Sequence, residues 1–173
     1  MGPVGRGAAL AVCSLAVAAA VAGPDPWASV RFLVGQWSGE GSGRPGAGSG
    51  TFSFRFDLDG SVLVRRDHSE YPAAEGRPAV VHDGLMVVYP QGSALAAVYF
   101  DNEGHVIRYD VSAAAPGPGV VFLSEPVAGA PRYRLTYQPL AVDEVMVTFE
   151  VAPPGEPPAF KAYVAGRSRR VAP

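Results

Sequence analysis

The chain has 173 residues, a formal net charge of −2 and a single cysteine, Cys13. This length suits one domain with its own hydrophobic core. The arginines are scattered except for a short basic tail at residues 167–170, so the broad basic face that nucleic-acid binding requires is missing, and we exclude nucleic acid as a partner.

The N-terminus is typical of a secretory signal peptide. Residues 8–22 form an apolar run that ends in the cleavage motif Ala20-Val21-Ala22. We expect cleavage after Ala22, which makes residues 1–22 the signal peptide and residues 23–173 a single secreted or periplasmic domain. A retained N-terminal anchor is the alternative. No later stretch is apolar enough to span a bilayer, so we expect no membrane span in the mature chain.

Cys13 lies inside this apolar run and would be removed with it. The exported chain would then contain no cysteine. Disulfides, thiol catalysis and cysteine-ligated zinc are thereby excluded together. Export without disulfides favours a bacterial source over eukaryotic secretion.

Strand signals follow a short helix that we predict over residues 28–34, ending at Gly35. Residues 51–58 alternate between apolar and polar side chains, with the apolar set Phe52, Phe54, Phe56 and Leu58 on one face. Asp59-Gly60 then predicts a tight hairpin. The returning strand, residues 61–71, should place Leu63 opposite Phe56. The sequence leaves open whether the phenylalanines point inward.

Further strands are expected wherever alternating segments are bounded by Gly, Pro or Asn turns. They cover residues 85–89, 95–101, 105–112, 120–124, 133–140, 145–151 and 160–164. With the strand around Trp37 the count is about ten. We therefore predict an all-β fold, an antiparallel up-and-down barrel with a short N-terminal helix.

A glycine-rich motif around the second tryptophan resembles that of nitrobindin-like proteins, which are ten-stranded, fatty-acid-binding-protein-like barrels of the calycin group, broadly lipocalin-like. The chain also resembles bacterial exported domains of unassigned function in that group. The residues that carry the resemblance are Gly35, Trp37, Gly39, Glu40, Gly41 and Gly43. The resemblance implies a barrel that holds a small molecule inside.

Nitrobindins bind heme through a histidine near the C-terminal strand, and this chain departs from that pattern. No histidine follows His105. We therefore predict no cofactor, while heme binding through His68, His82 or His105 stays open as an alternative. These three histidines lack any spacing that would prearrange a metal site, so we predict no metal and expect singly hydrogen-bonded histidines.

The polar segment around His68 allows two interpretations. Arg66, His68 and Glu70 share one face of a strand, and Asp67 and Ser69 share the other, which excludes a local Asp-His-Ser relay. The Arg66–His68–Glu70 stripe either lines one side of the cavity or forms a solvated outer face with cross-strand ion pairs.

Seven tyrosines lie in or near the predicted strands and suit a small-molecule pocket as well as a core. We predict non-catalytic binding of a small, mainly apolar molecule, with no catalytic residue. The expected ligand-binding residues are Trp37, Arg66, His68, Tyr99, His105 and Tyr109. The alternatives are a barrel isomerase or hydrolase with His68 or His105 as general base, and a ligand-free envelope module. Ligand identity and oligomeric state stay open.

Overall fold

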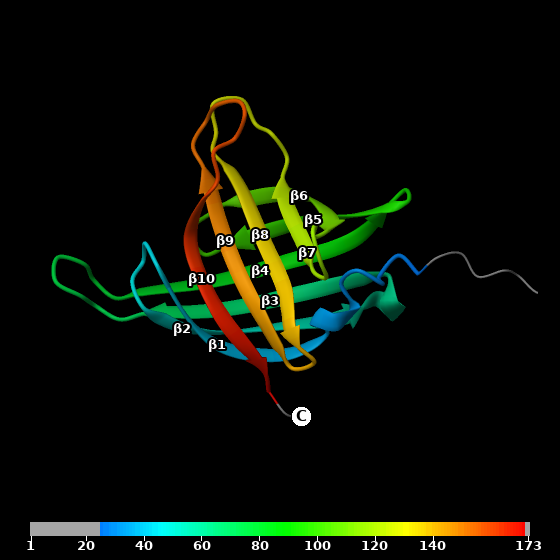
Figure 1. Ribbon diagram of the computed structural model, residues 1–173, viewed down its shortest axis with the longest axis horizontal. Coiled ribbons are helices and arrows are strands. Elements are labelled where there is room, and N and C mark those ends of the chain that lie inside the picture. Colours follow the sequence, from blue (N-terminus) through cyan, green and yellow to red (C-terminus); the bar gives the residue numbers. More distant parts are fainter. Residues whose placement is uncertain (1–24, 172–173) are drawn as a thin grey trace, which may run out of the picture.

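A computed structural model of the protein describes residues 25–171, which form one closed antiparallel barrel of ten strands (Figure 1). Each strand pairs with its neighbours along the chain, and the first pairs with the last. The strands are β1 (Gly35–Gly43), β2 (Gly48–Asp57), β3 (Val62–Tyr71), β4 (Val80–Gln91), β5 (Ala94–Asp101), β6 (Val106–Ala113), β7 (Val120–Ser124), β8 (Arg132–Ala141), β9 (Glu144–Ala152) and β10 (Lys161–Arg170).

This architecture confirms the predicted all-β, ten-stranded antiparallel barrel. Among the residues described, no helix is long and apolar enough to cross a membrane. The predicted signal peptide, with Cys13, lies outside the described residues and stays a prediction.

The N-terminal helix is shorter than predicted. Only η1 (Arg31–Leu33) is helical, and it is a 3-10 helix that follows a turn over residues 26–30. Trp27, Val30 and Leu33 are all buried. Their spacing of three residues matches the three residues per turn of a 3-10 helix, so one face of this segment packs into the barrel.

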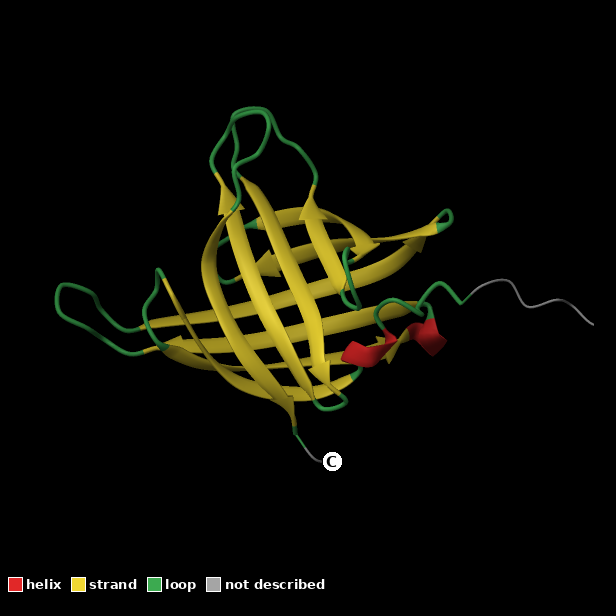
Figure 2. Ribbon diagram, in the orientation of Figure 1, coloured by secondary structure: helices red, strands yellow, loops and turns green. Residues whose placement is uncertain are grey.

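The predicted β2–β3 hairpin has the expected register but a longer turn. Phe56 lies opposite Leu63, as predicted. The turn includes η2 (Leu58–Gly60), where Leu58, Asp59 and Gly60 all have positive φ. The two short helices lie at the same end of the barrel (Figure 2), and Trp27 packs edge-on against Phe56 at a ring-centroid distance of 5.2 Å.

The three phenylalanines of β2 all lie on its inward face. Phe52 and Phe54 are buried, Phe56 is half-buried against Trp27, and Leu58 is exposed. Near η1 the interior is therefore a packed aromatic and aliphatic core. Its largest fully buried side chains are Trp37, Tyr137, Phe54, Phe122, Leu33, Leu63 and Met86.

Glycines allow the first and last strands to close the barrel. A Cβ atom on Gly39 would collide with the carbonyl oxygen of Arg167, and one on Gly166 would collide with that of Glu40. Side chains at these positions would push β1 and β10 apart. The glycine-rich motif therefore permits the close approach of the β1 and β10 backbones.

Candidate functional site

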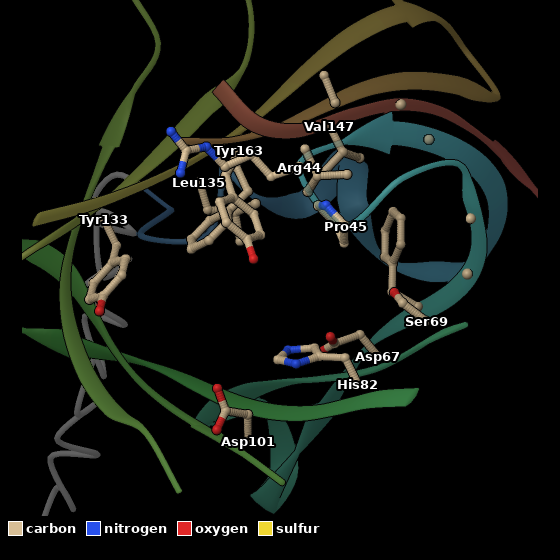
Figure 3. A pocket seen from close by; sticks show the side chains of 18 of the residues that line it. Arg44, Pro45, Asp67, Ser69, His82, Asp101, Tyr133, Leu135, Val147 and Tyr163 are labelled. Carbon is tan, nitrogen blue, oxygen red and sulfur yellow. The ribbon is translucent and has the colours of Figure 1, made fainter. Parts of the chain in front are cut away.

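A cavity of about 730 Å³ occupies the half of the barrel away from η1 (Figure 3). Its rim includes residues from the turns that join β1 to β2, β5 to β6 and β9 to β10, among them Pro45, Glu103 and Pro153. The opposite end is occupied by the packed core that includes Trp37 and Leu33. The barrel is thus filled at one end and hollow at the other.

The hollow exists because one wall carries almost no side chains. Five glycines from the adjacent strands β10, β1 and β2 line this wall: Gly39, Gly41, Gly48, Gly50 and Gly166. Large side chains line the rest of the cavity. In Figure 3, Asp67, His82 and Asp101 point into the cavity from one side, and Leu135 and Tyr163 point in from the opposite side.

A buried ion pair lies deep in the cavity, where it meets the core. Arg65 of β3 donates a hydrogen bond to the Asp67 carboxylate two residues along the same strand. Their side chains are only 10% and 7% exposed, and the guanidinium lies 5.8 Å from the centre of the Phe52 ring. Burial alone would lower the pKa of Arg65, but the Asp67 carboxylate reverses this and raises that pKa above its ordinary value.

Beside this pair, a chain of hydrogen bonds runs from the interior to the rim. Oε1 of Glu103 accepts a hydrogen bond from Nδ1 of His82 at 3.2 Å, and Nε2 of His82 lies 2.7 Å from the hydroxyl of Tyr99. Burial, reinforced by the Asp67 carboxylate, raises the pKa of Tyr99. Its hydroxyl therefore keeps its proton and stays a neutral hydrogen-bonding group beside Nε2 of His82.

His105 and Asp101 form the turn between β5 and β6. The Asp101 carboxylate accepts hydrogen bonds from the backbone N–H groups of Glu103 and His105, and from Nδ1 of His105 at 2.9 Å. Burial raises the pKa of Asp101, but the hydrogen bonds from His105 outweigh it and lower that pKa below its ordinary value. The Asp101 carboxylate and the His105 imidazole thus stabilise the β5–β6 turn through these hydrogen bonds.

Aromatic and aliphatic side chains form the rest of the lining. The rings of Tyr133 and Phe149 stack at a centroid distance of 5.9 Å, and Tyr163 packs edge-on against Phe149 at 6.1 Å. Burial raises the pKa values of Tyr109 and Tyr133 above their ordinary values. These phenols remain neutral hydrogen-bonding groups in an otherwise apolar surface.

Three of the six predicted ligand-binding residues line the cavity. Tyr99 and Tyr109 do so with buried rings, and His105 does so at the rim. Trp37 lies in the core, where its ring stacks on Phe52 and its Nε1 donates a hydrogen bond to the carbonyl of Leu33 at 2.8 Å. Direct ligand contact by these residues stays a prediction.

The prediction that Arg66 and His68 line the cavity is wrong. Both lie on the outer face of β3, since the inward positions are those of Arg65 and Asp67. On that outer face His68 bonds to Glu70 and to Asp83, at 3.0 Å and 2.7 Å. This confirms the alternative interpretation, a solvated face with cross-strand ion pairs.

Sequence reasoning missed Arg65, Asp67 and the position of His82, which lies within β4 although the predicted strand begins only at residue 85. A signal for the first two was available. The predicted register pairs Phe54 with Arg65 and Phe52 with Asp67. Directly paired residues share one face of a sheet, so inward phenylalanines imply an inward Arg65 and Asp67.

The donor set of the cavity does not suit a heme or metal ligand at His82. Both of its ring nitrogens are already engaged, by Glu103 and by Tyr99. Within residues 25–171, no group of three or more His, Cys, Asp and Glu side chains is arranged to hold a metal ion. The cavity chemistry that the structure displays is hydrogen bonding and apolar contact.

Comparison with known proteins supports the fold rather than a family. No family model matches the chain, and no curated protein matches its sequence. Among the solved structures that resemble it is the S-type phycobiliprotein lyase from Guillardia theta, with a TM-score of 0.50 and 9% sequence identity. The match covers 82% of this chain and 90% of that chain. It supports the barrel fold alone, while the resemblance to nitrobindin-like proteins of the calycin group stays a prediction.

Proposed function

We propose that this protein binds a small, mainly apolar molecule inside its barrel, without catalysing a reaction. The observation that carries the proposal is the cavity of about 730 Å³ on one side of a packed core. This volume lies within the range of small-molecule sites, about 300–1,000 Å³. The lining combines apolar walls with a few polar groups, which is the composition expected of such a site.

The alternatives fit the geometry less well. A general base needs to reach a bound substrate, yet His68 lies on the outer face. His105 is at the rim, where its Nδ1 is bonded to Asp101. A ligand-free structural module would be expected to have a filled interior, whereas the half of this barrel near the rim is hollow.

Native mass spectrometry of protein purified gently from its host tests the proposal, together with a visible absorption spectrum of the same sample. We expect a co-purifying small molecule that adds a discrete mass. A Soret band would instead indicate heme. An apo mass that stays unchanged after exposure to lipids and hemin would contradict ligand binding and favour the structural module.

We also propose that the protein is exported and cleaved after Ala22, as its N-terminal sequence predicts. The intact mass from the same sample tests this. A mature chain should begin at Gly23, and a mass that still includes residues 1–22 would contradict cleavage.

A further inference from the structure

The Arg65–Asp67 ion pair determines the net charge at the deep end of the cavity. Arg65 is the deepest positive charge in the lining, and its nearest charged neighbour is the Asp67 carboxylate. The positive charges of Arg44 and Lys161 lie at the rim instead, in or beside the turns. The deep polar end of the cavity therefore carries a neutralised pair rather than a free cation.

From this arrangement we infer that the cavity accepts an apolar molecule whose polar end is uncharged and both donates and accepts hydrogen bonds, as an amide or a hydroxyl does. A fatty-acid carboxylate should be disfavoured. The inference rests on the proposed function and specifies its ligand class.

Electrostatics disfavours a carboxylate ligand. A buried guanidinium on its own would attract an anion strongly, because water screens little of the interaction there. Asp67 already supplies that anion, in contact with Arg65. A second carboxylate would lie beside Asp67 in the same poorly solvated space, and like charges in that position repel each other.

Hydrogen bonding favours a neutral head that donates and accepts. Arg65 donates a side-chain hydrogen bond to Asp67, while its buried Nε and the buried hydroxyl of the nearby Tyr137 have no hydrogen-bond partner among the residues described. A guanidinium has five N–H donors, and a carboxylate has several acceptor positions. An amide or hydroxyl placed here would offer an oxygen to Arg65 and a hydrogen to Asp67.

Neighbouring groups support this polar end without adding charge. The Tyr99 hydroxyl is close enough to Asp67 that a Cβ atom on Gly84 would collide with both. Tyr109 also lines this region with a phenol that stays protonated. Leu135, Val147 and Phe149 line the apolar part, where a hydrocarbon tail would pack.

Decanamide and decanoate form a matched pair for the test, because their head groups have nearly the same shape but differ in charge. Titration calorimetry at neutral pH would measure both with the full chain. We expect the wild-type protein to bind decanamide at least about tenfold more tightly than decanoate, as expected for a charge-dependent hydrogen bond. Equal binding, or tighter binding of decanoate, would overturn the inference.

Asp67→Asn tests the cause of the preference. The substitution keeps the shape of the side chain but removes the anion that neutralises Arg65. Decanoate should then gain about tenfold or more in affinity and become the preferred ligand. Asp83→Asn is the matched control, since Asp83 lies outside the barrel in contact with His68, and it should keep the wild-type preference.

The experiments distinguish a failure of the inferred ligand class from a failure of the proposed binding. If Asp67→Asn folds and leaves the ratio of the two affinities unchanged, the inference is wrong and ligand binding stands. If that variant does not fold, the wild-type comparison still decides the inference. If neither compound binds to folded wild-type protein, both the inference and the proposed binding of such molecules fail.

Discussion

Tyr99 and His82 share a 2.7 Å hydrogen bond at the cavity wall, and a missing side chain makes room for it. Gly84 lies next to this bond, where a Cβ atom would come within 2.5 Å of the Tyr99 hydroxyl oxygen and would also collide with Asp67. The polar side of the cavity therefore depends on a glycine in the middle of a strand. This is a position where glycine is ordinarily unfavourable.

Gly84→Ala should consequently destabilise the protein by about 1–3 kcal/mol, the usual effect of overpacking. Urea denaturation would measure the loss. Adding Tyr99→Phe would not relieve the overpacking, because the ring carbon Cε2 stays 2.7 Å from the Cβ position and the hydrogen bond to His82 is lost, so the double variant should be no more stable than Gly84→Ala. A Gly84→Ala variant as stable as the wild type would show that Asp67 and Tyr99 have room to move away.

Filling the cavity should abolish ligand binding and leave the barrel intact. Val147 lines the cavity from β9, and Val147→Trp would place a large ring in the space that a ligand needs. Thr148→Trp, on the opposite face of the same strand, is the matched control. Calorimetry with decanamide should show binding to Thr148→Trp only. Unchanged binding to a folded Val147→Trp protein would place the ligand elsewhere.

Arg170 should be a large contributor to stability at the closed end. It donates hydrogen bonds to the carbonyls of Phe32 and Val34 and to Asp143, and its guanidinium lies 4.3 Å from the centre of the Trp37 ring. We expect Arg170→Ala to lower the free energy of unfolding by about 2–3 kcal/mol.

Arg170→Lys should retain little of this stability, because one ammonium group cannot reach the three acceptors that the guanidinium of Arg170 reaches. The control is Arg169→Ala. That side chain is 82% exposed and approaches Glu144 only to 3.8 Å, so its loss should change stability by less than about 0.5 kcal/mol. Equal effects of the two alanine variants in denaturation experiments would contradict the role of Arg170.

The ion pairs of His68 should make stability depend on pH. Hydrogen bonds to Glu70 and Asp83 raise the pKa of His68 above its ordinary value of 6.5. Because the folded-state pKa is the higher one, protonation stabilises the fold fully below 6.5. That contribution is lost as the pH rises through the folded-state value.

The difference in stability between wild-type protein and His68→Gln should therefore be present at about pH 5.5 and absent at about pH 8.5. Denaturant titrations at the two pH values would measure it. A difference of the same size at both would mean that His68 acts through packing rather than through its charge.

Much of the fold could be predicted because each strand has its own pattern of alternating residues and bounding turns within a short stretch of sequence. The alternation in residues 51–58 and the Asp59-Gly60 turn established the β2–β3 register. The N-terminal helix was predicted too long because Gly35 marks where a helical segment ends but not whether that segment is an α-helix or a 3-10 turn. The buried residues Trp27, Val30 and Leu33 recur every three residues, which is the period of a 3-10 helix.

The polar side of the cavity could not be predicted in the same way. Both faces of β3 carry charged residues, Arg65 and Asp67 inside and Arg66 and His68 outside. The usual rule that charges face solvent therefore cannot choose between them. The choice follows from pairing with Phe52 and Phe54, and their inward orientation became known only from the closed barrel.

The pairing of β1 with β10 also determines what happens when the barrel opens. These two strands come from opposite ends of the described chain, and their ladder includes Gly39 and Gly41 opposite Ser168 and Gly166. Separating them would leave two unpaired strand edges, each with free N–H and C=O groups that can recruit strands from other molecules. The seam is therefore where self-association into aggregates would begin, and a C-terminal truncation that removes β10 would expose it permanently.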